Sequence, residues 1–323
     1  MKTLPLGNSG IDVSVLCLGI LPFGTKVDRQ TSFAILDAYY EAGGRFIDTA
    51  NNYSKWHPGG VGTESETTLG AWMRERGNRD DLVIATKVGF NRDDIGPSLS
   101  RATIEREAIG SLERLQTDCV DLYYAHADIR TDPLEETLGA FDKLVTSGKV
   151  RAIGCSNYRA WRIAEARGIS RARGLASYCC VQQRHTYLRP QPGTSFGAQT
   201  SSNEDLLDYC REHDEVRMLA YSPLLNGAYT REDREIPAQY VGTDTEGRLE
   251  ALRAVCSEVE GTANQVIYAW MLAERPADAN SRYPVVIPLT APTVLDQLQE
   301  NLGALEVHLT AEQVARLDTA GDR

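Results

Sequence analysis

Eight short apolar runs recur along the chain, and each is followed by a segment with the residue pattern of an amphipathic helix. Continuously apolar runs are typical of strands buried on both faces, and alternation of strands with helices is typical of parallel sheets. Eight such units favour a closed (β/α)8 barrel, a TIM barrel, over an open doubly wound sheet. The expected strands lie within residues 13–19, 45–50, 82–89, 120–126, 150–157, 178–183, 217–224 and 284–290.

The expected helices lie between these runs, and one additional helix follows the eighth unit. A turn at Asn8-Ser9-Gly10, with alternating flanks, predicts an N-terminal β-hairpin outside the eightfold unit that closes the bottom of the barrel. No linker rich in Gly or Ser divides the chain, so we expect one domain over residues 1–323. The helices are predicted at 29–42, 64–76, 101–116, 133–148, 159–170, 203–213, 247–274, 294–303 and, as the extra C-terminal helix, 309–320.

Composition excludes several classes of protein. The formal net charge of −11 disfavours nucleic acid and anionic membranes as partners, because gripping phosphates requires a surplus of Lys and Arg. No apolar run approaches the ~20 residues of a membrane span, and the start of the chain lacks an apolar signal core. The seven cysteines form no C-x-x-C pair, and most lie in apolar runs, so we expect reduced thiols and a cytoplasmic protein.

Four ionisable side chains follow or end neighbouring predicted strands. Asp48 ends the second strand, Lys87 the third and His126 the fourth, and Tyr53 lies in the loop after the second. The ends of parallel strands meet at one mouth of a barrel, so we expect these side chains to converge. Lys87 lies in the apolar run LVIATKVGF, and burying its charge requires a carboxylate partner.

These four residue types together suit an acid site. A phenol has a pKa near 10, and a neighbouring ammonium lowers it by favouring the phenolate. The carboxylate holds the lysine, and a neutral imidazole orients a substrate oxygen. Each residue alone also fits a structural role, such as a turn cap or a packed ring. Their joint occurrence at adjacent strand ends favours the chemical interpretation.

Several longer blocks share one resemblance. In this order they resemble the blocks of the aldo-keto reductase family, and the resemblance covers essentially the whole chain. The blocks are FIDTANNY (46–53), LVIATKVG (82–89), VDLYYAH (120–126), GKVRAIGCSNY (148–158), VQQRH (181–185), AYSPL (220–224) and QLQENLGAL (297–305).

The resemblance implies hydride transfer between a nicotinamide cofactor and a small carbonyl or alcohol substrate. It implies that Tyr53 is the general acid, assisted by Lys87, Asp48 and His126. It also implies the cofactor contacts: Ser156, Asn157 and Gln182 at the carboxamide, Tyr221 stacked on the ring, Ser222, Leu224 and Asn226 at the pyrophosphate, and Thr293, Gln297, Glu300 and Asn301 at the adenosine.

Two departures from the family pattern affect specificity. Ala291-Pro292-Thr293 stands where the family has a different block, and no Lys or Arg occurs between Arg282 and Arg316. The resemblance implies NADP(H), but a 2′-phosphate needs a cationic donor, so NAD(H) stays open and we expect weak discrimination. In the long loop after Tyr53, Trp56 and His57 either shape a polar pocket for sugars or polyhydroxylated ketones or only pack the loop.

Two other functions compete with the reductase. The run Gly193-Thr194-Ser195-Phe196-Gly197 fits the G-x-S-x-G pattern of serine esterases, with His213 downstream, although no strand and helix flank it. A regulatory module that binds nucleotide without turnover is the second alternative. The sequence contains no metal-binding motif. A homo-oligomer is possible, and the residues do not decide it.

Overall fold

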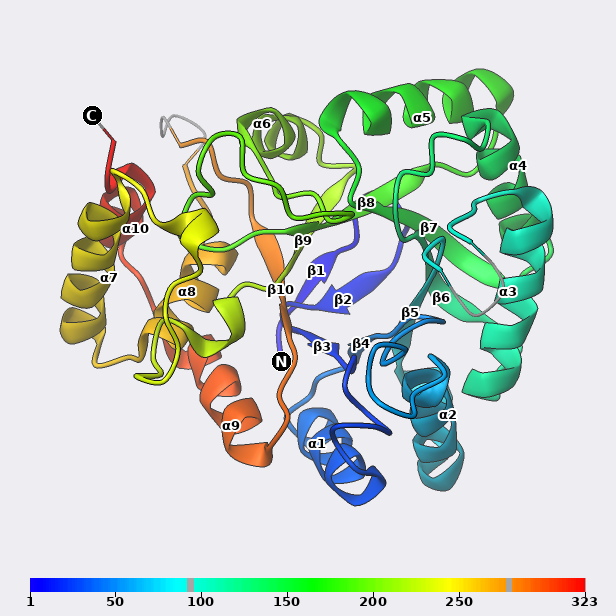
Figure 1. The fold of residues 1–323 in the computed structure, drawn as a ribbon, viewed down its shortest axis with the longest axis horizontal. Helices are drawn as coiled ribbons and strands as arrows, with labels where there is room; N and C mark the ends of the chain where they lie inside the picture. The colour runs from blue at the N-terminus through cyan, green and yellow to red at the C-terminus, as the bar shows by residue number, and fades with distance from the viewer. Residues whose placement is uncertain (92–95, 277–280, 323) are drawn as a thin grey trace.

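Eight parallel strands close into a barrel, with helices around its outside (Figure 1). The computed structural model describes residues 1–91, 96–276 and 281–322. The strands pair in the order β10-β3-β4-β5-β6-β7-β8-β9, and pairing of β10 with β3 closes the ring. The predicted (β/α)8 barrel is therefore confirmed. Its strands are β3 (Cys17–Gly19), β4 (Phe46–Asp48), β5 (Val83–Val88), β6 (Val120–Ala125), β7 (Val150–Ser156), β8 (Tyr178–Arg184), β9 (Arg217–Tyr221) and β10 (Val286–Thr290).

The helices cover the barrel with their apolar faces. On α4, for example, Leu138, Phe141 and Leu144 recur at three-residue steps and are all buried. The helices are α1 (Arg29–Glu41), α2 (Glu64–Arg76), α3 (Arg101–Leu115), α4 (Leu134–Thr146), α5 (Ala160–Arg173), α6 (Glu204–Glu212), α7 (Thr245–Val259), α8 (Ala263–Leu272), α9 (Leu295–Gly303) and α10 (Ala311–Thr319). In the described parts of the chain, none of them combines the length and apolar character that a membrane span requires.

The segment 247–274 is two helices, so the prediction of one helix there is wrong. Helix α7 ends where Glu260 adopts a left-handed conformation with φ 52°. Thr262 then begins α8 with a capping box, in which its side chain accepts from the Gln265 backbone N–H and the Gln265 side chain accepts from the Thr262 backbone. Helix α8 packs against β10, and α7 packs against α8 and α10.

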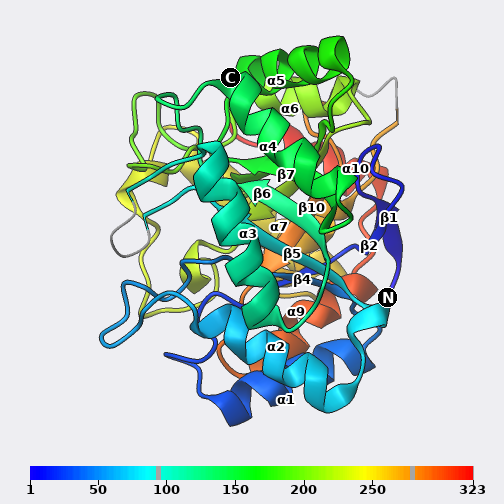
Figure 2. The same cartoon turned by 90° about the vertical axis from the view of Figure 1, so that its right-hand side faces the viewer.

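The N-terminal hairpin closes one end of the barrel, as predicted. Strands β1 (Thr3–Pro5) and β2 (Asp12–Ser14) pair antiparallel. Leu6, Ile11 and Val13 are buried among side chains of the barrel interior. Figure 2 shows the hairpin at the end of the barrel away from the long loops. The first apolar run, 13–19, is therefore divided between the hairpin and β3, whereas the prediction made it one strand.

The additional C-terminal helix is also confirmed. Thr310 caps α10 through a capping box with Gln313. Asp318 on α10 accepts a hydrogen bond from the buried Trp270 indole at 2.7 Å and pairs with Arg275 at 2.9 Å. These contacts hold the end of the chain against the barrel. The extent of a single domain over residues 1–323 stays a prediction.

Two glycines of the hairpin test its role as a plug. Gly7 has φ +53°, and a Cβ there would lie 2.1 Å from the Cys179 carbonyl oxygen, whereas Gly10 has φ +72° and no atom within 4 Å. Gly10→Ala should cost about 1–2 kcal/mol of unfolding free energy from backbone strain. Gly7→Ala should cost at least about 2 kcal/mol more, because the backbone must also move. Urea unfolding followed by circular dichroism measures both; equal losses would mean that the hairpin is loosely docked.

Candidate active site

The carboxyl ends of three neighbouring strands carry the predicted acid site. Asp48 is the last residue of β4, Lys87 lies at the end of β5, and His126 directly follows β6. Tyr53 lies in the turn after β4, and the structure brings all four side chains together at one mouth of the barrel. Asp48 and Lys87 have no exposed surface.

Lys87 is the centre of the hydrogen-bond network. Its Nζ donates to Asp48 Oδ1, to the Thr49 carbonyl oxygen at 2.7 Å and to Tyr53 Oη at 2.8 Å. An ammonium has three N–H donors, so these three acceptors satisfy its charged form completely. Burial lowers the pKa of Lys87, and the negative charge of Asp48 opposes that shift.

The Tyr53 phenol both accepts and donates hydrogen bonds. Its oxygen accepts from Lys87, and its O–H donates to Asp48 Oδ1 at 3.3 Å. Burial raises the pKa of Tyr53 well above its usual value, and the charge of Asp48 raises it further. Burial and Asp48 thus shift the pKa of Tyr53 in the direction opposite to the lowering that the sequence leads us to expect from Lys87. The phenol keeps its proton at neutral pH and has one to donate.

Gln182 links the far side of the barrel to this network. Its Nε2, on β8, donates to Asp48 Oδ2 at 2.8 Å, so both oxygens of the carboxylate are bonded. The family resemblance placed Gln182 at the cofactor carboxamide, and no sequence pattern indicated this contact. The amide therefore also orients Asp48 from across the barrel.

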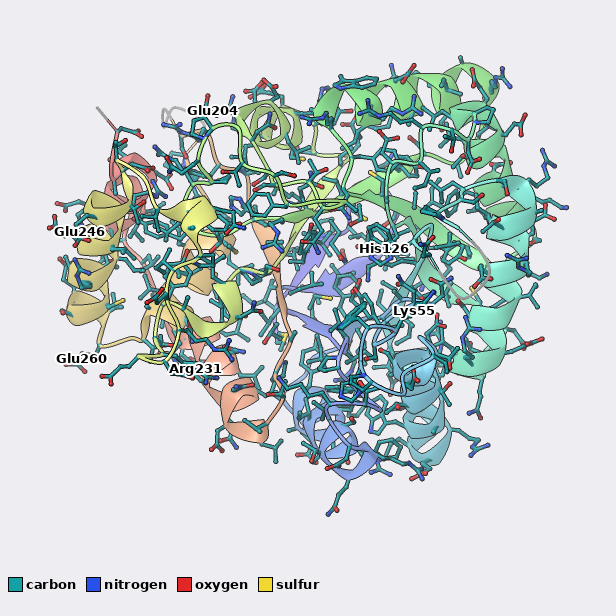
Figure 3. All side chains as sticks on the ribbon, viewed as in Figure 1. Lys55, His126, Glu204, Arg231, Glu246 and Glu260 are labelled. Carbon is teal, nitrogen blue, oxygen red and sulfur yellow. The ribbon has the colours of Figure 1, made fainter. Side chains whose placement is uncertain are left out.

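His126 is a neutral imidazole beside the phenol. Burial lowers the pKa of His126 well below its usual value, and the charge of Lys87 adds to the shift. Its ring makes edge-to-face contacts with Phe90 at 4.5 Å and Tyr53 at 5.9 Å between centroids. The buried Nδ1 has no hydrogen-bond partner among the described residues. Figure 3 shows His126 near the barrel mouth.

A cavity of about 500 Å³ opens above these side chains. Most of the predicted site residues line it: Asp48, Tyr53, Trp56, His126, Ser156, Asn157, Gln182, Tyr221, Ser222, Asn226 and Thr293. Lys87 is not among the lining residues, but its Nζ donates to Tyr53 Oη, and Tyr53 lines the cavity. Residues that the sequence analysis missed complete the wall: Gly19, Leu21, Pro22, Lys26, Asn52, Phe90, Gln199, Leu289 and Ala291. Several of them follow predicted strands, which is the signal that could have identified them.

Asn157 and Tyr221 form a bonded pair on the cavity wall. Asn157 adopts φ 60°, and its Oδ1 accepts from Tyr221 Oη at 2.7 Å and from the Thr200 backbone N–H at 3.0 Å. Its Nδ2 donates to the His126 carbonyl oxygen at 2.9 Å. The pair therefore fixes the Tyr221 ring, which a stacking role requires, while the Asn157 amide is already bonded within the protein.

A second cavity of about 560 Å³ extends from the first toward α9. Lys26, Asn226, Ala291 and Thr293 line both cavities, so together they form one continuous groove. All four residues predicted at the adenosine, together with Leu224, line the second cavity: Thr293, Gln297, Glu300 and Asn301. Other lining residues were not predicted as cofactor contacts. They are Lys26, Gly227, Thr230, Arg231, Arg234, Asn264, Tyr268, Ala291 and Pro292.

The backbone after β9 is strained where it borders both cavities. Ser222, Leu225 and Asn226 adopt φ values of 55°, 49° and 58°, which side chains other than glycine rarely adopt. Such conformations cluster at ligand sites, because the surrounding structure must hold them in place. No sequence pattern in this segment predicted the strain.

His57, Ser195 and His213 lie outside both cavities. The Nδ1 of His57 contacts the Pro58 carbonyl oxygen at 3.0 Å. Its neighbour Trp56 lines the first cavity at the rim, with 64% of its surface exposed. Ser195 is exposed in a loop without the strand and helix of an esterase elbow, and His213 ends α6, 3.9 Å from Glu215. The esterase pattern is therefore not assembled.

The groove combines polar and basic side chains. It joins two cavities, and Lys26 and Arg231 supply positive charge to an acidic protein. Polar side chains border both halves of the groove. Among residues 1–91, 96–276 and 281–322, no group of three or more His, Cys, Asp or Glu side chains is placed to hold a metal ion.

Comparisons with known proteins agree with this arrangement. The Aldo/keto reductase family profile matches residues 15–322. The uncharacterized oxidoreductase YrpG of Bacillus subtilis is 31% identical, over 98% of this chain and 95% of its own. Norsolorinic acid reductase of Aspergillus flavus is 30% identical, over 97% and 79%. The solved structure of the thermostable aldo-keto reductase Tm1743 with epalrestat superposes with a TM-score of 0.75, at 26% identity, over 99% and 100%.

Proposed function

The chain belongs to the aldo/keto reductase family of oxidoreductases, and on that premise we propose that it reduces a small-molecule carbonyl with a nicotinamide dinucleotide. The observation that carries the proposal is the phenol of Tyr53. It bears a proton, it is bonded to a buried ammonium, and it faces a cavity large enough for a substrate. The reverse reaction, alcohol oxidation, uses the same groups.

Each side chain has one task in the proposed reaction. A bound reduced nicotinamide supplies the hydride. Tyr53 gives its Oη proton to the substrate oxygen as negative charge develops there. Lys87 stabilises the resulting phenolate, because its ammonium already donates to that oxygen at 2.8 Å. The neutral ring of His126 carries one N–H for the substrate oxygen, and Asp48 keeps Lys87 charged and in place.

The cofactor contacts lie along the groove. The nicotinamide end belongs beside Ser156, Asn157, Gln182 and Tyr221, and the adenosine end beside Gln297, Glu300 and Asn301. Both NADP(H) and NAD(H) are compatible with these contacts. A cytoplasmic location stays a prediction.

The side chains at the rim of the inner cavity favour an apolar carbonyl substrate. Leu21, Pro22, Trp56 and Phe90 line the inner cavity, and they offer mainly flat or aliphatic surface. The expectation of a sugar rested on Trp56 and His57 together, and of these two residues Trp56 lines the cavity whereas His57 lies outside the lining. We therefore favour an aryl or similarly apolar aldehyde or ketone over a polyhydroxylated one.

Tyr53→Phe tests the proposed acid. The change removes the proton donor and leaves the ring, so kcat for carbonyl reduction should fall about a hundredfold or more. Cofactor affinity, measured by fluorescence titration, should stay within about twofold, since the phenol faces the substrate oxygen. The matched control is Tyr123→Phe on β6, which removes a buried hydroxyl that has no hydrogen-bond partner among the described residues. If Tyr53→Phe kept more than a tenth of the wild-type kcat, the acid would be another group. If the wild-type protein bound the cofactor without turnover, the regulatory alternative would be favoured.

A neighbouring pair of variants tests the substrate class. Trp56→Ala should raise KM for 4-nitrobenzaldehyde about three- to tenfold while kcat changes little, because the lost contact is made equally in ground and transition states. His57→Ala, one residue away and outside the lining, should leave both constants unchanged. The protein would instead prefer polar substrates if His57→Ala changed KM more than Trp56→Ala does, or if an aldose were turned over better than the aryl aldehyde.

A further inference from the structure

A third cavity lies apart from the groove. It has a volume of about 310 Å³ and is enclosed by the loop after β8, the start of α6 and the segment before β10. Its lining residues are different from those of the groove. Figure 3 shows Glu204, which lines this cavity, apart from His126 at the mouth of the barrel. Ligand pockets have volumes of about 300–1,000 Å³, so this cavity suits a small ligand.

Apolar and aromatic side chains line much of the interior. The ring of His185 forms part of the lining, and it stacks on Trp270 with 5.8 Å between centroids and 23° between planes. Burial lowers the pKa of His185 to about 3, and the charges of Arg275 and Arg248 add to the shift, so the ring is neutral at physiological pH. The interior therefore favours an aromatic ring over a chain of hydroxyl groups. The other apolar and aromatic lining residues are Tyr187, Leu188, Pro190, Pro192, Leu207 and Tyr283.

Two arginines of this cavity hold one carboxylate between them. Arg189 and Arg282 both belong to the lining. Arg189 Nη1 lies 2.7 Å from Asp322 Oδ1, and Arg282 Nη2 donates to Asp322 Oδ2 at 2.9 Å. The two guanidinium groups come from different segments, one after β8 and one before β10, and converge on a single carboxylate. They therefore form an anion site, which Asp322 occupies in this structure.

Asp322 is a replaceable occupant of that anion site. It follows α10 in the chain, it lies outside the lining of the cavity, and 36% of its side chain is exposed. Ion pairs with exposed side chains are weak, so a ligand that brings its own carboxylate loses little by displacing Asp322. Such a ligand can also bury a ring among the apolar side chains of the cavity, which the aspartate side chain cannot do.

The other charges around the two arginines are compatible with this exchange. Arg282 Nη1 donates to Glu204 Oε1 at 2.6 Å, and the Glu204 side chain is 80% exposed. Arg189 Nη1 lies 3.8 Å from Asp244 Oδ2. Replacement of the Asp322 carboxylate by another carboxylate keeps these pairs and leaves the local net charge unchanged. An uncharged ligand would instead leave the anion site to Asp322.

We propose that this cavity is a second ligand site, for a small aromatic carboxylate, and that Asp322 competes with the ligand for the anion position. The ring of the ligand lies among the apolar and aromatic side chains, and its carboxylate lies between Arg189 and Arg282. The residues of this site are different from those assigned to carbonyl reduction, so the inference does not rest on the proposed function.

Titration calorimetry of the whole protein with benzoate tests the site. Acetate, which lacks the ring, and benzyl alcohol, which lacks the charge, are the comparison probes. Benzoate should bind at least about tenfold more tightly than either, because it alone engages both parts of the site. Arg282→Gln should weaken benzoate binding about tenfold or more and leave the affinity for benzyl alcohol within about twofold of wild type.

Removal of the internal competitor gives the sharper test. Asp322→Asn keeps the shape of the side chain and removes its charge, so it should strengthen benzoate binding about three- to tenfold. Glu258→Gln is the matched control, because it neutralises a similarly exposed carboxylate that pairs with Arg316 outside the cavity. The control should leave benzoate affinity unchanged.

Three results would overturn the inference. The first is benzoate binding in Asp322→Asn that is unchanged or weaker than in wild type. The second is equal affinity for benzoate, acetate and benzyl alcohol. The third is benzoate affinity that falls in Trp56→Ala but not in Arg282→Gln, because the ligand would then lie in the inner cavity. Melting curves check the folding of each variant, and the exposed position of Asp322 keeps the test available if Arg282→Gln unfolds.

Discussion

The buried ammonium of Lys87 is the interaction on which the site depends. An unpaired charge inside a barrel is strongly destabilising, and removal of one partner from a buried pair typically costs about 3–5 kcal/mol. Lys87 avoids this cost because Asp48, Thr49 and Tyr53 supply one acceptor for each of its N–H groups. The same requirement fixes the phenol in position before any substrate arrives, which is the preorganisation that an acid catalyst needs.

The barrel supplies this geometry, and the loops build the groove beyond it. Asp48 and Lys87 lie on short strands whose pairing sets their depth, and Gln182 reaches Asp48 from β8, so opposite sides of the barrel hold one carboxylate. The groove beyond them is built from loops, with strained backbone at Ser222 and Leu225. Chemistry on the rigid strands and specificity on the loops is the division that lets one barrel serve many substrates.

Local residue pattern and strand direction were enough to predict the barrel and the centre of the site. Alternation of apolar runs and helices indicated the barrel, and residues at the ends of parallel strands converge, so Asp48, Tyr53, Lys87 and His126 could be grouped. Features set by long-range packing were missed. The contact of Gln182 with Asp48, the cations that line the groove and the raised pKa of Tyr53 all depend on how distant segments enclose a site. The break at Glu260 was missed because the apolar pattern of two adjacent helices runs on across it.

Lys87 acts through the Tyr53 phenol in the proposed reaction, and a double-mutant cycle tests this central claim most directly. The measurement is kcat for 4-nitrobenzaldehyde reduction in Tyr53→Phe, Lys87→Met and the double variant, each checked for folding by its melting curve. Residues that act as one unit are strongly non-additive. The double variant should therefore be no more than about threefold slower than Tyr53→Phe alone. Multiplicative losses would contradict the claim, because Lys87 would then serve the reaction independently of the phenol.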